Sequence, residues 1–277
     1  MNPDILGMSY NSARDELFLA DKYNRVVRTT HLRENSGPLL DVYLGSPHDT
    51  SPNVYSVCYM KGPDMLLVCS GEKGPNNKLA DWLVGLCRNG DKWREEQRVQ
   101  TAGKGLLCCV LSDLRVLVGN ADYNSSKYME LFQVVYSKSR LSILLIHLIL
   151  VPEEYRWFSA MSDNANETLV AMSFYDQTVR VHRLLGNRLD IFASIMLIDP
   201  NSVLWLGNRL IVSELYYETK VYGVIELVVK GTLLEPRNEL IDSKARICVR
   251  SWCEVSDGLA IFDGKLVELM HWVATKL

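Results

Sequence analysis

A pair of short apolar runs that recurs along the chain constrains its fold more than any other feature. The first copy spans Glu16 to Arg28, ELFLADKYNRVVR, in which an apolar run, a polar turn and a second run follow one another. Alternation of apolar and polar residues is typical of a half-buried β-strand. The first copy therefore predicts two adjacent strands joined by a turn.

Five further copies follow at a regular spacing. Their equivalent positions are Phe18, Leu67, Leu117, Val170, Ile211 and Ala260, which are separated by 49, 50, 53, 41 and 49 residues. Four-stranded propeller blades occupy about 40 to 50 residues each, and the β-branched and aromatic content of the runs favours strands over helices. We therefore predict an all-β fold, a six-bladed β-propeller of four-stranded antiparallel blades whose last blade is closed atypically.

Flanking runs complete the predicted blades. Innermost strands are expected at 5–10, 54–59, 106–111, 157–161, 203–206 and 247–252, and outer strands at 39–44, 96–101, 141–151, 189–197 and 233–240. Residues 1–277 are thus expected to form one propeller domain, with blades at approximately 5–44, 53–101, 105–151, 155–197, 202–240 and 246–277.

The sixth blade lacks a predicted outer strand, which leaves two ways to close the ring. Either His271 to Leu277 turns back as a short strand, or Ile5 to Tyr10 itself completes the last blade. Both alternatives keep six blades.

Charge and hydropathy exclude two classes of partner. The chain has 30 Lys and Arg against 33 Asp and Glu, so it lacks the basic excess with which proteins neutralise nucleic acid phosphates. The longest apolar run, Leu141 to Val151, is shorter than the roughly 20 residues of a membrane span. We interpret it as a long buried strand, and its His147 as a core or sheet-edge residue without a metal.

The expected location is cytoplasmic. The N-terminal residues do not resemble a secretory signal, and the seven cysteines form no CxxC and cannot all pair within one chain. Most of them lie in apolar runs, where free cysteine behaves as a small hydrophobe, and this pattern favours a reducing compartment.

The first repeat also resembles an NHL-type propeller repeat. In that family an apolar strand ends in Asp and is followed by Asn, Arg and an apolar residue, an order that Asp21, Asn24, Arg25 and Val26 reproduce with one residue fewer between Asp and Arg. The other five copies keep only the apolar skeleton. The resemblance therefore covers the whole chain as a period and one repeat as a motif.

Propeller relatives imply a binding face made by the turns between second and third strands and by the blade crossings. Tyr, Trp and Arg are enriched at interaction hot spots. On this face we predict a protein or peptide partner bound by Tyr23, Arg25, Tyr123, Tyr155, Arg156, Trp157, Tyr175, Tyr216 and Tyr217. The predicted function is a non-catalytic interaction module, a scaffold or adaptor, of open oligomeric state.

Catalytic motifs are absent from the sequence. It contains no GxSxG, no HExxH and no GxxxxGK, and Cys108 and Cys109 lie in an apolar strand that favours core packing. We accordingly predict no catalytic residue, no cofactor and no metal ligand.

Two alternatives stay open. Propellers similar to gluconolactonases are metal-dependent hydrolases that hold a divalent cation in the central channel through oxygen ligands. The residue types for such a site are present at Asp21, Glu72, Asn120, Asp122, Asp176 and Glu214. A glycan-binding propeller, with aromatic pockets repeated around the ring, is the other alternative.

Overall fold

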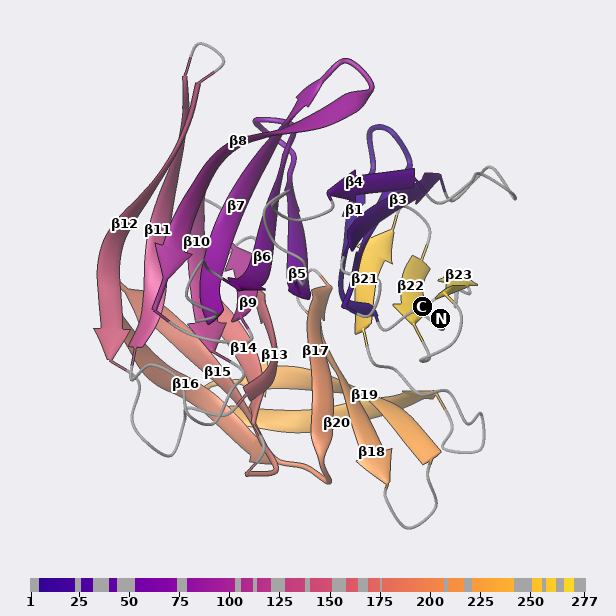
Figure 1. Ribbon diagram of the computed structural model, residues 1–277. Coiled ribbons are helices and arrows are strands. Elements are labelled where there is room, and N and C mark those ends of the chain that lie inside the picture. Colours follow the sequence, from indigo (N-terminus) through magenta and orange to yellow (C-terminus); the bar gives the residue numbers. More distant parts are fainter. Residues whose placement is uncertain are drawn as a thin grey trace.

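Twenty-three β-strands and no helix make up the described part of the chain (Figure 1). The computed structural model describes residues 5–22, 26–31, 40–43, 53–73, 79–102, 106–111, 114–120, 128–137, 140–150, 158–163, 169–174, 176–206, 209–216, 221–241, 251–255, 258–262 and 267–271. No helix of these residues is long and apolar enough to cross a membrane.

The strands form six antiparallel blades in chain order, as the sequence predicts. Blade 1 contains β1 (Ile5–Asn11), β2 (Glu16–Asp21), β3 (Val26–His31) and β4 (Leu40–Tyr43); blade 2 contains β5 (Asn53–Met60), β6 (Met65–Lys73), β7 (Leu79–Asn89) and β8 (Lys92–Thr101); blade 3 contains β9 (Leu106–Val110), β10 (Arg115–Asn120), β11 (Tyr128–Ser137) and β12 (Arg140–Leu150).

The second half of the chain repeats this arrangement. Blade 4 contains β13 (Phe158–Asp163), β14 (Leu169–Phe174), β15 (Thr178–Leu185) and β16 (Arg188–Met196); blade 5 contains β17 (Pro200–Leu206), β18 (Arg209–Tyr216), β19 (Val221–Lys230) and β20 (Leu233–Ile241); blade 6 contains β21 (Ser251–Val255), β22 (Gly258–Phe262) and β23 (Val267–His271). The fold is a six-bladed β-propeller.

The second strand of a blade is buried on both faces, which explains why it is an unbroken apolar run. All six residues of β2 are buried. Leu17 and Leu19 pack in a core cluster with Leu206 and Trp252 of blades 5 and 6, whereas Phe18 and Ala20 pack against blade 2. Because successive side chains of a strand point to opposite faces, one strand contributes to the contacts with both of its neighbouring blades.

The opening repeat forms the hairpin that its pattern predicts. Glu16 faces His31 and Asp21 faces Val26 across β2 and β3. The other edge of β2 pairs with β1, from Ile5 opposite Asp21 to Asn11 opposite Glu16. The strand Ile5–Asn11 is therefore the innermost strand of blade 1 and does not complete blade 6.

The ring closes through contacts between innermost strands. Each innermost strand contacts the next one along the chain, and β21 contacts β1 (Figure 1). Side chains of both ends share one core cluster, in which Ile5 and Met8 pack with Trp252 and Cys253. The other predicted means of closure, a strand at His271 to Leu277, lies outside the described residues after His271.

Blades 4 and 5 are also joined at their outer edges. Ser194 of β16 and Leu233 of β20 form a parallel bridge pair, which makes the two blades one eight-stranded sheet. No other pair of neighbouring blades shares a sheet within the described ranges.

The expectation that the run Leu141 to Val151 is buried is wrong. Leu141, Ile143 and Ile149 of β12 are buried, but every residue from Leu144 to Leu148 and also Leu150 is exposed. The physical reason is position: β12 is the outer strand of blade 3 and pairs only with β11 among the described strands. His147 is exposed on this sheet edge, which agrees with the second of the two positions predicted for it, the core or a sheet edge.

Candidate functional site

The predicted binding face falls largely outside the described residues. This holds for Tyr23, Arg25, Tyr123, Tyr155, Arg156, Trp157, Tyr175 and Tyr217, and Tyr216 is described only as the last backbone position of β18. The face that these nine residues define therefore stays a prediction.

Two buried carboxylates at the blade crossings are occupied by backbone hydrogen bonds. Ala102, which follows blade 2, donates its N–H to Glu130 Oε2 of blade 3 at 2.9 Å. Ile198, which precedes blade 5, donates its N–H to Glu214 Oε1 at 3.0 Å. Burial raises the pKa of Glu130, and the hydrogen bond from Ala102 partly opposes this shift. Both side chains therefore stabilise the segments that connect one blade to the next. Glu214, a member of the alternative metal set, accepts a hydrogen bond from the backbone.

Asp176, another residue of the alternative metal set, closes its own turn. It accepts a hydrogen bond from the Thr178 N–H at 3.1 Å and forms an ion pair with Arg180. Among the described residues, no group of three or more His, Cys, Asp and Glu side chains is placed to hold a metal ion. Asp122 and the side chains of Glu72 and Asn120 lie outside that description.

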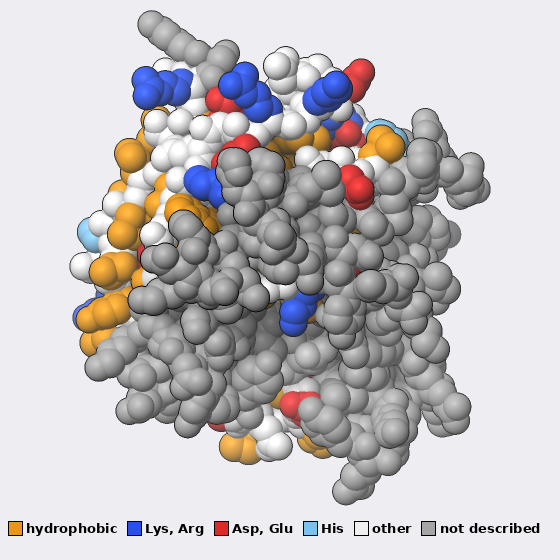
Figure 2. Space-filling view, in the orientation of Figure 1, with side chains coloured by type: hydrophobic (Ala, Val, Ile, Leu, Met, Phe, Trp, Pro, Cys, Tyr) orange, Lys and Arg blue, Asp and Glu red, His pale blue; other side chains and the backbone are white. Residues whose placement is uncertain are grey.

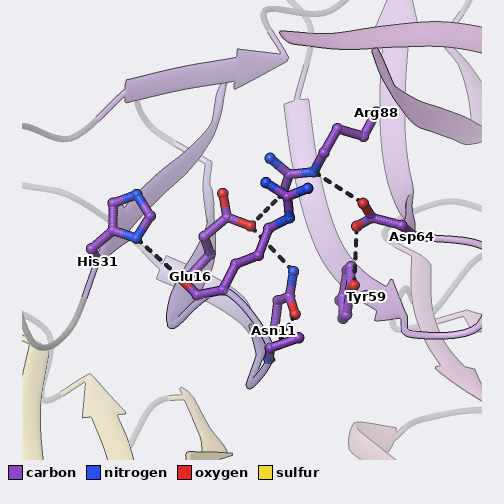
Figure 3. A network of polar contacts seen from close by, with 8 residues as sticks. Asn11, Glu16, His31, Tyr59, Asp64 and Arg88 are labelled. Atoms are coloured by element: carbon purple, nitrogen blue, oxygen red, sulfur yellow. Dashed lines mark hydrogen bonds and ion pairs between the residues drawn. The ribbon is translucent and has the colours of Figure 1, made fainter. Parts of the chain in front are cut away.

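A polar network with the buried pair Arg88–Glu16 at its centre joins blades 1 and 2 (Figure 3). Arg88 of β7 pairs with Glu16 of β2, and Glu16 also accepts a hydrogen bond from Asn11 Nδ2 at 3.2 Å. On its other side, Arg88 Nε lies 3.3 Å from Asp64 Oδ2, and the Tyr59 hydroxyl donates to Asp64 Oδ1 at 3.0 Å.

Aromatic rings enclose this network. The Arg88 guanidinium lies 4.3 Å from the ring centroid of Trp93, and Phe18 contacts both Trp93 and Tyr59. Burial, followed by the hydrogen bond to Asp64, raises the pKa of Tyr59 to about 12. The residues flank the turns β1–β2, β5–β6 and β7–β8, which lie opposite the predicted binding face. We therefore assign them a structural role.

The outer edge of blade 3 carries five of the exposed large hydrophobic side chains found among the described residues. The exposed part of β12, which we call the β12 edge, consists of Leu144, Leu145, Ile146, His147, Leu148 and Leu150. Leu144 is 51% exposed, Leu148 50% and Leu150 65%. Figure 2 shows the hydrophobic side chains along this side of the molecule, at the left of the view. Contiguous apolar exposure of this kind marks interaction sites on soluble proteins.

Three other outer strands of the propeller, β4, β8 and β20, are protected in the usual ways. Natural edge strands are short, charged or interrupted by proline, because a free strand edge pairs with other chains. Strand β4 has four residues, β8 reads KWREEQRVQT, and β20 contains Pro236 and Arg237. Strand β12 has eleven residues and no charged side chain after Arg140.

At Ile143, the backbone of β12 forms hydrogen bonds with a side-chain amide of blade 2. Gln97 of β8 accepts a hydrogen bond from the Ile143 N–H at 2.7 Å and donates one to the Ile143 carbonyl at 3.2 Å. The backbone groups of Ile143 that point away from β11 are thus hydrogen-bonded to the side chain of Gln97 in blade 2. Beyond Ile143 no described strand covers it, and Ile146 is the extra residue of an irregularity between the pairs Leu131–His147 and Phe132–Leu145.

Comparison with known proteins supports the fold and no particular family. No family model matches the sequence, and no curated protein matches it. The structure is similar to β-propellers. One is the PQQ-bound aldose sugar dehydrogenase of Streptomyces coelicolor, with 10% identity, a TM-score of 0.56, and coverage of 94% of this chain and 88% of that one.

Two other similar structures come from protein complexes. A chain of the mitotic checkpoint complex has 10% identity and a TM-score of 0.57, with coverage of 97% of this chain and 91% of that one. A chain of the nidogen/laminin complex has 9% identity and a TM-score of 0.53, with coverage of 81% and 76%. At such identities the likeness shows the propeller fold alone.

Proposed function

We propose that this propeller is a non-catalytic protein-interaction module, a scaffold or adaptor, and that the β12 edge binds an extended segment of a partner protein. The observation that carries the proposal is the long, uncharged and exposed outer strand of blade 3. Fold alone does not specify function, so the argument rests on this surface.

Backbone hydrogen bonding supports the extended form of the partner. In an antiparallel edge strand, alternate residues turn their N–H and C=O groups away from the paired neighbour. Peptides that add to such an edge gain affinity from these groups and specificity from alternate side chains. The paired contacts of Gln97 with Ile143 are the same exchange, made by one side-chain amide.

The side chains of the β12 edge favour an apolar and uncharged partner segment. Leu144, Leu148 and Leu150 offer no group that could pair with a buried charge, and β16 adds exposed Ile191 and Met196 beside β12. A charged residue placed against this surface would lose its hydration without compensation. Similar propellers that occur in protein complexes support an interaction role in general terms.

The binding face predicted from the sequence is the competing surface for the same function. It comprises nine aromatic and arginine residues between Tyr23 and Tyr217, and the resemblance of the first repeat to NHL-type repeats favours a partner there. Variants of the two surfaces therefore decide between them.

The experiment compares captured partners of three proteins. Wild type, a Leu148→Lys/Leu150→Lys variant and a Trp157→Ala/Tyr216→Ala/Tyr217→Ala variant are used as bait in lysate of the source cells. We expect a stoichiometric partner that the first variant loses and the second retains. Hydrogen exchange of the purified complex should then protect amides between Leu144 and Leu150.

Three outcomes contradict the proposal. If the Leu148→Lys/Leu150→Lys variant retains the partner and the Trp157→Ala/Tyr216→Ala/Tyr217→Ala variant loses it, the binding site lies on the predicted turn face and not on the β12 edge. Failure to recover any stoichiometric partner would count against an interaction module. Self-association through the same edge, measured by light scattering, would make a second copy the occupant. Because Leu148 and Leu150 are exposed, the lysine variant should unfold at the wild-type temperature.

A further inference from the structure

Three cysteine thiols from different strands meet in the core between blades 2 and 3. Cys58 lies on β5, Cys69 on β6 and Cys108 on β9, and the core cluster around them spans both blades. None of the three is part of a disulfide bond. Innermost strands β5 and β9 contact each other, so the cluster lies where two blades meet near the centre of the ring.

The sulfur atoms of Cys58 and Cys108 are in direct contact. Cys108 Sγ lies 3.4 Å from Cys58 Sγ, and the Cys58 thiol donates a hydrogen bond to the Cys108 carbonyl at 3.2 Å. The Ser56 hydroxyl lies 3.4 Å from Cys108 Sγ. A disulfide bond is about 2.05 Å long, so the two sulfur atoms need to approach by about 1.4 Å to bond.

We propose that Cys58 and Cys108 form a peroxide-reactive thiol pair that closes to a reversible disulfide between blades 2 and 3. The proposal does not depend on the β12 edge or on any partner protein. It concerns a different part of the molecule and would stand if the interaction proposal failed.

The difference in exposure between the two thiols gives each a role. Cys58 is half-buried, whereas Cys108 is buried. A small oxidant from solvent therefore reaches Cys58 first, and Cys108 is held beside it as the second thiol. Reactive cysteines are partly exposed, whereas buried ones are inert towards reagents in solvent, so we expect Cys108 to react with the Cys58 sulfur beside it.

The reaction needs hydrogen peroxide as its oxidant. Cys58, having lost its proton to water, attacks one peroxide oxygen, the O–O bond breaks, and Cys58 sulfenic acid and water form. Cys108, as its thiolate, then attacks the Cys58 sulfur, the S–O bond breaks, and the leaving hydroxide takes up from solvent the proton that Cys108 had released, which gives a second water. Two thiols and one peroxide thus give one disulfide and two waters, with each sulfur oxidised and both peroxide oxygens reduced.

The electrostatics of the cluster favour Cys108 as the attacking thiol of the second step. Hydrogen bonding with Cys58 and Cys69, and to a smaller degree with Ser56, holds the pKa of Cys108 well below its ordinary value against the effect of burial. The hydrogen bond with Cys108, together with burial, raises the pKa of Cys69 well above its ordinary value. Since the thiolate is the nucleophile, Cys108 rather than Cys69 is the partner of Cys58.

The test begins with the reduced full chain treated with a small molar excess of hydrogen peroxide. Remaining thiols are then blocked with N-ethylmaleimide in denaturant, and peptides are analysed by mass spectrometry without reduction. We expect a Cys58–Cys108 cross-linked peptide and a fall from seven to five free thiols, both reversed by dithiothreitol. The disulfide would close a loop between two cysteines that are 50 positions apart in the chain. Closing such a loop should raise the melting temperature by roughly 5 to 10 °C.

Variants separate this pair from general oxidation. Cys58→Ser should remove the peroxide-dependent melting shift, and Cys108→Ser should leave Cys58 as a sulfenic acid that dimedone traps. Cys87→Ser is the matched control, because Cys87 has the same partial burial in the same core, and it should behave as wild type.

Two results would overturn the proposal, and neither needs a folded variant. One is a peroxide-treated wild-type chain in which other cysteines are oxidised and no Cys58–Cys108 peptide is found. The other is a peptide that links Cys69 to Cys108, which would reassign the pair.

Discussion

Arg88 and Glu16 form an ion pair between two blades, with only 8% and 7% of their side chains exposed. The two residues are 72 positions apart in the chain. A buried pair of this kind gives little net stability over a well-packed apolar pair, because both charges lose their hydration. Loss of one partner is different, since it leaves the other charge buried and uncompensated.

Replacement of Arg88 by Met should therefore destabilise the propeller strongly. We expect a loss of about 3–5 kcal/mol in the free energy of unfolding, measured in urea. The double variant Arg88→Met/Glu16→Met should recover much of this loss, because no charge is then left buried. The exposed pair Arg188–Asp190 is the control: Arg188→Met should change stability by less than about 1 kcal/mol. Equal losses at both sites would refute the assigned role of Arg88.

His182 should make the protein acid-sensitive. It is buried on β15, neither ring nitrogen has a hydrogen-bond partner among the described residues, and its ring lies 6.1 Å from that of Phe174. Burial, helped by the charge of Arg180, lowers the pKa of His182 to about 4. The unfolded chain, with a pKa near 6.5, takes up this proton first as the pH falls.

The contribution of His182 is thus fully present above pH 6.5 and is lost as the pH falls towards 4. At about 1.4 kcal/mol per pH unit, this loss is on the order of 3 kcal/mol. The variant His182→Leu should show a flatter dependence of unfolding free energy on pH over this range. His147→Gln, which changes an exposed ring on β12, should keep the wild-type slope, and a wild-type slope in His182→Leu would contradict the prediction.

Gly71 should not tolerate a side chain. A Cβ atom at this position of β6 would lie 2.6 Å from Asp81 Oδ1 and 2.8 Å from the Tyr55 hydroxyl. Overpacking of this kind costs about 1–3 kcal/mol, so Gly71→Ala should lower the melting temperature. Gly62→Ala, where a Cβ meets nothing within 4 Å, should leave it unchanged or raise it slightly. The two glycines thus provide a matched pair for thermal unfolding.

Glu130 should be replaceable by Gln but not by Ala. Gln keeps an oxygen that accepts the Ala102 N–H, whereas Ala leaves that donor without its partner, at a cost of about 1–3 kcal/mol. Because burial raises the pKa of Glu130, the folded state holds the proton to higher pH than the unfolded state. Wild-type stability relative to Glu130→Gln should therefore fall as the pH rises above 4.5, and a constant difference would argue against this assignment.

The period of the apolar runs is sufficient to predict the propeller, because each blade repeats the same burial. The run around Phe18 is apolar at every position since its two faces serve two neighbouring blades. The same reasoning fails at Leu141 to Val151. An eleven-residue apolar strand has the same pattern in a core and at an uncovered edge, and only the assembled ring shows which applies.

The interblade contacts could not be predicted for a related reason. Arg88 and Glu16, or Cys58 and Cys108, carry no local signal, since each pair lies in different blades and is brought together by the stacking of whole sheets. Cys108 looked like a core residue from its apolar neighbours, and it is buried. Its contact with Cys58 depends on how far β9 is shifted along its axis relative to β5, and the length of the repeat does not specify this shift.

The bridge between Ser194 and Leu233 predicts that blades 4 and 5 unfold as one cooperative unit. Blades 4 and 5 form one continuous hydrogen-bonded sheet, whereas the other described blades meet through side chains. Subglobal opening follows such units of shared backbone bonding. Amides of the strands β13 to β20 should then exchange with solvent in one common event, which hydrogen exchange followed by mass spectrometry would measure.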